Sequence, residues 1–116
     1  MLSIDTMLND QHLTTYWSDG LIIATPTGST GYSLSSGGPI VSPSSKCIVI
    51  NPIAPHNINM RPLIVPDETT LKISVKGRGN THLLSLDSRI YTIDNGNDIH
   101  IKKAGFNLLT VQLQGT

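Results

Sequence analysis

Alternation between apolar and polar residues, repeated in several segments, is the feature that most limits how this chain can fold. Residues 71–77 read LKISVKG, so that Leu, Ile and Val are separated by Lys and Ser. Residues 98–103 alternate in the same way around Ile99 and Ile101, and LTVQL at residues 109–113 repeats the pattern. A period of two is typical of strands with one solvent-facing side. The chain is therefore predicted to be built mainly from β-strands.

Two apolar runs lack this alternation, and turn-forming residues separate the predicted strands. LIIA at residues 21–24 and CIVI at residues 47–50 are continuous, which is typical of strands buried on both faces. Turn-forming residues occur in LND at 8–10, KGRGN at 76–80 and DNGND at 94–98. The Asn-Gly pair in the last of these predicts a β-hairpin, because it tolerates positive φ.

Helical signals are weak by comparison. The one candidate is TGYSLSSGG at residues 30–38, and Gly37 and Gly38 would end that helix early. We therefore expect an all-β fold, a multi-stranded antiparallel β-sandwich of about eight to ten short strands with one short helix after the Gly/Ser/Thr loop. Strand-like residues at both ends predict that residues 1–116 are one domain, the second half of a larger protein.

The charge balance and the single cysteine restrict the expected partners and compartment. Lys plus Arg and Asp plus Glu count 8 each, so no excess charge points to a nucleic acid or a membrane surface. No apolar run approaches the roughly 18 residues of a membrane-spanning helix, and no signal peptide is recognisable. Cys47 lies in the run CIVI and is interpreted as a small apolar side chain in a buried strand, in a reducing, cytoplasmic protein.

The stretch TPTGSTGYS, at residues 25–33, is the strongest candidate for a binding site. Pro26 fixes one φ angle, and Gly28 and Gly31 permit backbone geometries closed to other residues. Backbone N–H groups could then converge on one concavity, which suits ribose hydroxyls and phosphate oxygens. Further hydroxyls come from Thr25, Thr27, Ser29, Thr30, Ser33 and Ser35. An ordinary strand–loop–helix junction is the alternative, and composition alone leaves both interpretations open.

Three known motifs are excluded in this stretch. A P-loop has the pattern G-x-x-x-x-G-K-[ST], in which a Lys directly follows the second Gly. Neither Gly31 nor Gly38 is followed by a Lys. A nucleophile elbow needs G-x-S-x-G, which neither Ser29 nor Ser33 satisfies. A dinucleotide fingerprint needs a βαβ unit, and the chain has no such pattern. Any binding here would therefore use a different arrangement of backbone and hydroxyl groups.

A second candidate segment is rigid. Residues 51–67 read NPIAPHNINMRPLIVPD, and four prolines in this run imply an extended backbone that holds His56 and Arg61. Either could bind a ligand, but an ordinary hydrogen bond for His56 and an ion pair for Arg61 are favoured. Asp19 and Asp87 could each bind a ribose diol or cap a turn. The four His residues lie in different segments without ligand spacing, so no metal site is expected.

Together, three stretches resemble the C-terminal, NAD-binding domain of bacterial ATP/polyphosphate NAD kinases. They are SDGLIIATPTGSTGYSLSSGGPIVSP at residues 18–43, PIAPHNINMRPLIVPD at 52–67 and LDSRI at 86–90, and the resemblance covers about residues 2–111. It implies ATP-dependent phosphorylation of the adenosine-ribose 2′-hydroxyl of NAD, giving NADP, with Mg²⁺ shielding charge. It also implies an N-terminal α/β domain with a G-G-D-G motif, which this sequence lacks. The chain alone is therefore expected to hold no catalytic residue and to be inactive.

What the resemblance transfers is substrate binding, residue by residue. The implied NAD-binding residues are Asp19, Thr27, Thr30, Gly31, Tyr32, Ser33, Leu34, Ser35, Ala54 and Arg89. Trp17, His56 and Ser88 fall beside these contacts. Arg89 and Ser88 depart from the family pattern, since many members have Gln and Gly at these two positions. Asn9-Asp10 imitates the family's Asn-Glu motif, but its distance from Asp19 fits a hairpin turn instead.

The resemblance also sets the expected partners and leaves alternatives. Family members are dimers or tetramers, so we expect self-association to a homodimer or homotetramer, with Asp19 in some members contacting NAD across a subunit interface. The rivals are a non-catalytic β-sandwich ligand-binding module and a domain of a related lipid kinase, whose acceptor pocket would be more apolar. The phosphoryl donor, ATP or polyphosphate, and the preference for NAD or NADH stay open.

Overall fold

Strands make up almost all of the regular structure in this chain. The computed structural model describes residues 2–30, 34, 37–57, 60–77, 79–86, 89–103 and 109–113, with only the backbone described for residues 30, 86 and 109–113. The strands are β1 (Leu2–Leu8), β2 (Gln11–Ser18), β3 (Gly20–Ala24), β4 (Cys47–Ile53), β5 (Leu63–Pro66), β6 (Leu71–Lys76), β7 (Thr81–Leu86), β8 (Arg89–Asp94), β9 (Asp98–Lys103) and β10 (Leu109–Leu113). One short 3₁₀ helix, η1 (Thr27–Thr30), follows β3. The all-β prediction is confirmed.

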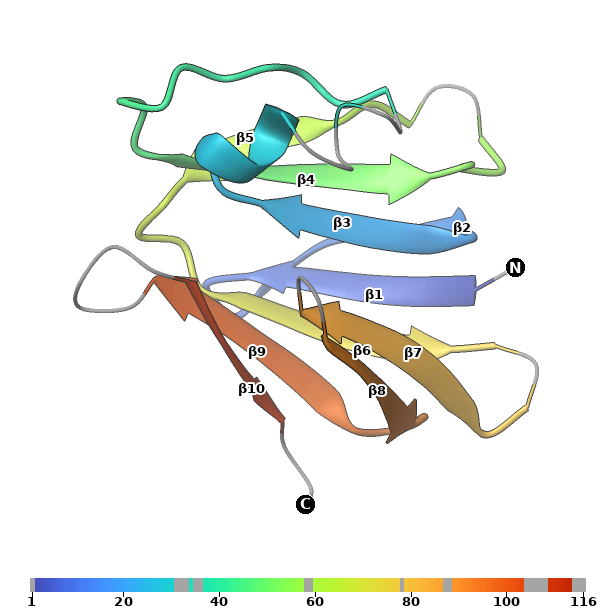
Figure 1. Ribbon diagram of the computed structural model, residues 1–116. Helices are drawn as coiled ribbons and strands as arrows, with labels where there is room; N and C mark the ends of the chain where they lie inside the picture. The colour runs from blue at the N-terminus through green and yellow to red at the C-terminus, as the bar shows by residue number, and fades with distance from the viewer. Residues whose placement is uncertain are drawn as a thin grey trace.

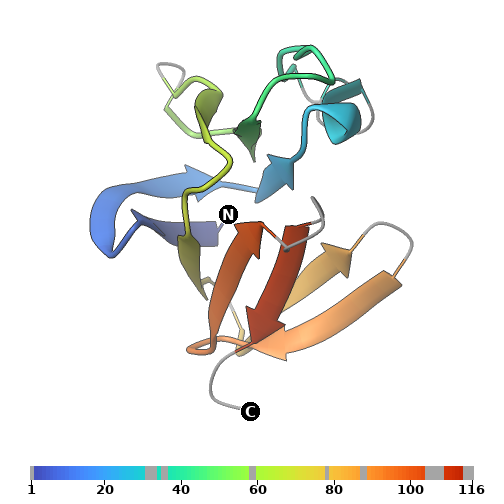
Figure 2. The same ribbon diagram turned by 90° about the vertical axis from the view of Figure 1, so that its left-hand side faces the viewer.

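The strands form three antiparallel sheets. A five-stranded sheet has the order β10-β9-β6-β1-β2, a three-stranded sheet has the order β3-β4-β5, and β7 pairs with β8 as a two-stranded ribbon. Figure 1 shows the three-stranded sheet stacked above the five-stranded one. In Figure 2 the β1–β2 hairpin and the β7–β8 ribbon lie on opposite sides of the molecule. The chain passes between the two larger sheets where β2 is followed by β3.

The hydrophobic core lies between the two larger sheets. Alternate residues of β6, Leu71, Ile73 and Val75, are buried, as are Ile99 and Ile101 of β9, so the alternation predicted for both segments is confirmed. The other sheet contributes to the same cluster through Ile48, Ile50 and Val65. Burial of each such side chain stabilises the fold by roughly 1.5–3 kcal/mol relative to exposure. The core therefore fixes which face of each strand points inward.

The two continuous apolar runs behave differently. In β4, Ile48, Val49 and Ile50 are all 0% exposed, so burial on both faces is confirmed for this run. In β3 only Ala24 is buried, and the prediction of a fully buried strand is wrong there. The physical reason is position, because β4 is the central strand of its sheet and β3 is an edge strand. Cys47, at the start of β4, is a free, half-buried cysteine rather than a fully buried one.

The predicted turn at residues 8–10 makes a hairpin, and the one at residues 94–98 does not. Asn9 and Asp10 have positive φ angles of 49° and 66° and join β1 to β2, which confirms the turn predicted there. Gly96 has a φ of 97° in the turn between β8 and β9, but those strands pair with β7 and β6 instead of each other. The predicted hairpin is therefore wrong, because this turn carries the chain from the ribbon into the five-stranded sheet. A backbone hydrogen bond holds this turn beside the segment before β7, since the Asn95 N–H donates to Asn80 O at 2.6 Å.

Asp98, at the start of β9, makes the stability of the five-stranded sheet depend on pH. The Ser74 hydroxyl donates to Asp98 Oδ1 at 2.5 Å, and Lys72 Nζ lies 3.5 Å from Oδ2. The Ser74 hydrogen bond, followed by the charge of Lys72, holds the pKa of Asp98 below its ordinary value of 3.8, although burial opposes this shift. Stability from this carboxylate is present above that ordinary value and is lost as pH falls through the lower folded pKa.

We predict that Asp98→Asn flattens the acid side of the stability curve. The free energy of unfolding of the unsubstituted chain should fall faster than that of the variant as pH decreases from about 5 to about 2, because only the unsubstituted chain must protonate this carboxylate. Urea unfolding at several pH values measures the difference. Asp10→Asn, which removes an exposed turn carboxylate, is the control. Parallel curves for Asp98→Asn and the unsubstituted chain would contradict the prediction.

Candidate functional site

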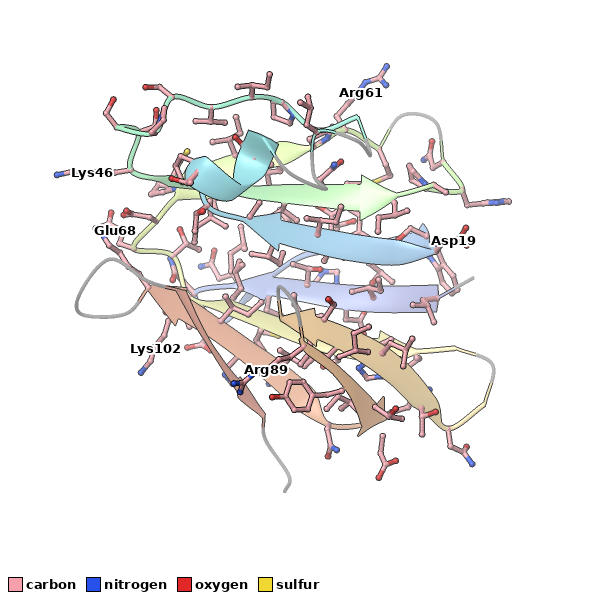
Figure 3. The ribbon with its side chains drawn as sticks, in the orientation of Figure 1. Asp19, Lys46, Arg61, Glu68, Arg89 and Lys102 are labelled. Atoms are coloured by element: carbon pink, nitrogen blue, oxygen red, sulfur yellow. The ribbon has the colours of Figure 1, made fainter. Side chains whose placement is uncertain are left out.

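The β2–β3 corner, residues 18–20, is the structural basis of the candidate site. β2 ends at Ser18 and β3 begins at Gly20, so the chain changes sheets at Asp19. Ser18 is fully buried, and its hydroxyl donates to the Gly20 carbonyl oxygen at 2.8 Å. A Cβ on Gly20 would lie 3.0 Å from Ile53 Cδ1, so glycine allows the close approach of β4. Asp19 itself is exposed, and Figure 3 shows it at the start of β3.

Two backbone hydrogen bonds join this corner to the segment that follows β4. The Asp19 N–H donates to the Ile53 oxygen at 2.9 Å, and the His56 N–H donates to the Trp17 oxygen at 2.8 Å. Between these bonds Ala54 has a positive φ of 48°, a conformation that costs a non-glycine residue roughly 1–2 kcal/mol. Backbone strain of this kind often accompanies a functional site. The structure thus brings together four predicted residues from two separate segments.

These four residues present a ring and a carboxylate to solvent. Trp17 is 55% exposed. This is unusual, because tryptophan side chains are highly buried on average. Asp19, Ala54 and His56 are exposed beside it. An open indole face can stack on a planar ring of a ligand, and a carboxylate can accept two hydrogen bonds from neighbouring hydroxyls. The corner is therefore equipped to bind a ligand that carries both a ring and a diol.

The first turn of the Gly/Ser/Thr stretch does not contribute as the sequence suggested. The Gly28 N–H donates to Thr25 Oγ1 at 3.0 Å, and the Ser29 N–H donates to the Thr25 carbonyl at 2.9 Å. Ser29 is fully buried, and its hydroxyl donates to Pro26 O at 2.6 Å while accepting from the Val41 N–H at 3.1 Å. Gly28 does not adopt a positive φ either. These amides and hydroxyls bond within the loop, so the predicted convergence on a ligand is not seen at Thr25, Gly28 and Ser29.

The rest of that stretch is described only in part. Gly31, Tyr32, Ser33 and Ser35 lie outside the described residues, as does Ser88, and of Thr30 only the backbone is described. Leu34 is 41% exposed. The Gly37 N–H donates to the Leu34 oxygen at 3.0 Å, and Gly37 has a φ of 83°, a conformation typical of a glycine that ends a helical turn. Gly37 therefore takes the conformation that the predicted helix end requires.

Thr27 lies at the other end of β3 from Asp19. Its exposed side chain borders an open cavity of about 350 Å³. The remaining lining residues are Pro43, Ser44, Ser45, Lys46, Asp67 and Lys103. Lys103 Nζ lies 3.0 Å from Asp67 Oδ2, and Figure 3 shows Lys46 and Asp19 at opposite ends of the three-stranded sheet. No motif in the sequence pointed to this polar cavity, because its charged residues come from three distant segments.

Two other predicted residues lie away from the corner. Arg89 is exposed at the start of β8, in the ribbon, and Figure 3 shows it far from Asp19. Arg61 is exposed before β5 and projects outward in the same view. Within one chain, therefore, the structure gathers Trp17, Asp19, Ala54 and His56 but does not bring Thr27 or Arg89 to them.

Neither a metal-binding cluster nor a membrane-spanning helix occurs among the described residues. Across the part of the chain that the structure describes, no three His, Cys, Asp or Glu residues are grouped so that they could hold a metal ion. Among those residues there is also no helix with the length and apolar character needed to cross a membrane.

Similarity to known proteins covers nearly the whole chain. A family model described as "ATP-NAD kinase C-terminal domain" matches residues 1–113. The NAD kinase of Christiangramia forsetii is 59% identical over 115 residues, which are 99% of this chain and 39% of that protein. The NAD kinase of Flavobacterium psychrophilum is 53% identical over 113 residues, 97% of this chain and 38% of that protein. The chain thus spans about two fifths of the length of these relatives.

Solved structures agree with the sequence comparisons. Yeast NADH kinase complexed with NADH superposes with a TM-score of 0.81 at 33% identity, covering 99% of this chain and 33% of the yeast chain. An NAD kinase from Archaeoglobus fulgidus in complex with ATP also gives a TM-score of 0.81, at 28% identity, covering 96% of this chain and 42% of that one. The resemblance noted in the sequence is confirmed, and this chain belongs to the ATP-NAD kinase C-terminal domain family.

Proposed function

We propose that this chain is the NAD-binding domain of an NAD kinase, which transfers the γ-phosphoryl group of ATP to the adenosine-ribose 2′-hydroxyl of NAD. The observation that carries the proposal is the family match over residues 1–113, together with 59% identity to a bacterial NAD kinase. The two similar structures, a complex with NADH and a complex with ATP, support a nicotinamide dinucleotide and ATP as substrates. No relative or similar structure reported above favours a non-catalytic module or a lipid kinase.

The proposed reaction divides the work between this domain and the remaining three fifths of the protein. Phosphoryl transfer depends on holding the acceptor hydroxyl in line with the γ-phosphate and on neutralising the developing charge. We assign the acceptor side to residues 1–116 and the phosphate side, with its G-G-D-G segment, to the part outside this chain. Mg²⁺ would enter with ATP on that side, since the described residues do not group into a metal site.

At the acceptor side, the exposed corner residues would hold the dinucleotide. The Asp19 carboxylate accepts hydrogen bonds from a ribose diol, and the Trp17 ring packs against a planar ring of the ligand. Ala54 and His56 border the same space, because the two backbone bonds hold their segment against Trp17 and Asp19. The wider proposed NAD-binding set is Asp19, Thr27, Thr30, Gly31, Tyr32, Ser33, Leu34, Ser35, Ala54 and Arg89, with Trp17, His56 and Ser88 beside it.

Self-association is part of the proposal. Thr27 and Asp19 lie at opposite ends of β3, whose five residues span roughly 16 Å. A second copy of the chain could place its own Asp19 near the Thr27 end of the first, so that a homodimer or homotetramer completes each NAD site.

The unpaired Cys47 fits the cytoplasm as the proposed compartment.

The proposal is tested with a chimera in which this chain replaces the matching part of the Christiangramia forsetii NAD kinase. Since the two are 59% identical over 115 residues, the replacement should fold against the rest of that enzyme. We predict that the chimera forms NADP from NAD, ATP and Mg²⁺, and that residues 1–116 alone form none. Enzymatic cycling assays for NADP measure both.

The relative's own full-length enzyme is the positive control for this assay. A chimera that is folded by circular dichroism but forms no NADP would contradict the proposed function. NADP formation by the isolated chain would instead overturn the assignment of the phosphate side to the rest of the protein.

Asp19→Asn in the chimera tests the role of the corner. Loss of charged hydrogen bonds worth about 1.5–3 kcal/mol should raise the KM for NAD about ten- to a hundredfold, with a smaller change in the KM for ATP. Asp94→Asn, which alters an exposed carboxylate on β8, is the matched control and should leave both constants unchanged. An equal KM for NAD in the Asp19→Asn and unsubstituted chimeras would show that Asp19 does not bind the acceptor.

A further inference from the structure

Ser18 is a polar side chain at a position where the strand pattern calls for an apolar one. In β2, Tyr16 and Ser18 are 3% and 0% exposed, while Trp17 between them is 55% exposed, so Ser18 points inward. A buried hydroxyl costs free energy unless it makes a hydrogen bond, and a serine buries less apolar surface than a larger side chain would. The presence of Ser18 here therefore needs an explanation in what its hydroxyl does.

The Ser18 hydroxyl makes a hydrogen bond that bridges across Asp19. It donates to the Gly20 carbonyl oxygen at 2.8 Å, two residues further along the chain. A side-chain bond of this local kind restricts the backbone angles of the residue between its two ends. The Asp19 N–H is held separately, by the Ile53 oxygen at 2.9 Å. The peptide unit before Asp19 and the Gly20 carbonyl group, on either side of the residue pair Asp19-Gly20, are thus both held by hydrogen bonds.

Asp19 depends on this backbone fixation for its direction. Among the described residues, none makes a hydrogen bond or ion pair with its carboxylate. The side chain is exposed, and Figure 3 shows it at the edge of the molecule. With no such partner among the described residues, the carboxylate takes its place from the Asp19 backbone, where the side-chain torsions χ1 and χ2 begin. Any rotation of the peptide units beside Asp19 would move the carboxylate.

We propose that Ser18 is a positioning residue for NAD binding, which holds the Asp19 carboxylate in its binding direction through the hydrogen bond to the Gly20 oxygen. This inference rests on the proposed function, because it assumes that Asp19 contacts NAD. It adds that the affinity for NAD is set partly by a buried hydroxyl that never touches the ligand. Positioning of this kind lowers the entropy that the site loses on binding.

Ser18→Ala in the chimera is the first test. Loss of one neutral hydrogen bond should raise the KM for NAD about two- to tenfold, while kcat stays the same within about twofold. The matched control is Thr6→Val, since Thr6 is also 0% exposed in the five-stranded sheet and its hydroxyl has no partner among the described residues. Thr6→Val should leave the KM for NAD unchanged, so a general effect of removing a buried hydroxyl is excluded.

A double-mutant cycle separates positioning from a general structural role. If Ser18 acts through the carboxylate, Ser18→Ala should have no further effect on the KM for NAD in the Asp19→Asn background. Equal effects of Ser18→Ala in both backgrounds, or no effect in either, would overturn the positioning role alone. If Asp19→Asn itself leaves the KM unchanged, the binding role of Asp19 in the proposed function fails as well.

Ser18→Cys keeps the inference testable if Ser18→Ala does not fold. Cysteine is close to serine in size but is a weak hydrogen-bond donor, so it preserves packing while weakening the bond to the Gly20 oxygen. The same cycle with this variant should again raise the KM for NAD only when Asp19 is intact. A KM for NAD equal to that of the unsubstituted chimera would contradict the proposal.

Discussion

Two backbone hydrogen bonds, from Asp19 to Ile53 and from His56 to Trp17, determine the arrangement on which the rest of this account depends. They hold the end of β2 against the segment that leaves β4, although the two are separated by more than thirty positions in the sequence. Because β2 and β4 belong to different sheets, the same bonds also connect the two layers at their edge. The exposed ring and carboxylate on this edge are the chemical groups that the proposed acceptor site requires.

The opposite end of β3 is organised by the hydrogen bonds of one buried side chain. Buried Ser29 links Pro26 to Val41 through its hydroxyl, and so brings the returning loop back onto η1. That end presents Thr27 beside a polar cavity. A strand with a proposed binding residue at each end suits a ligand built from two linked nucleosides, and it suits the proposed site shared between two copies of the chain. This separation agrees with the proposal, drawn from the family resemblance, that the domain binds NAD as part of an oligomer.

Local patterns in the sequence predicted the strands well, but not their partners or the use of the polar groups. Alternation identified the inward residues of β6 and β9, because one buried face imposes a period of two. The apolar run in β3 looked like that in β4, and only the sheet order makes one an edge strand and the other central. DNGND has the composition of a hairpin turn, but its flanking strands find partners far away in the sequence. Composition likewise could not show that the hydroxyls of Thr25 and Ser29 face the backbone.

The most direct test of the central claim is amide hydrogen exchange of the chimera with and without NAD. The account predicts that NAD slows exchange in two segments together, residues 17–19 and 53–56, because the ligand rests on both and the bonds between them then open less often. The β8–β9 turn around Asn95 should show little change. Slower exchange confined to other segments, with these two unaffected, would contradict the claim that the corner forms the acceptor site.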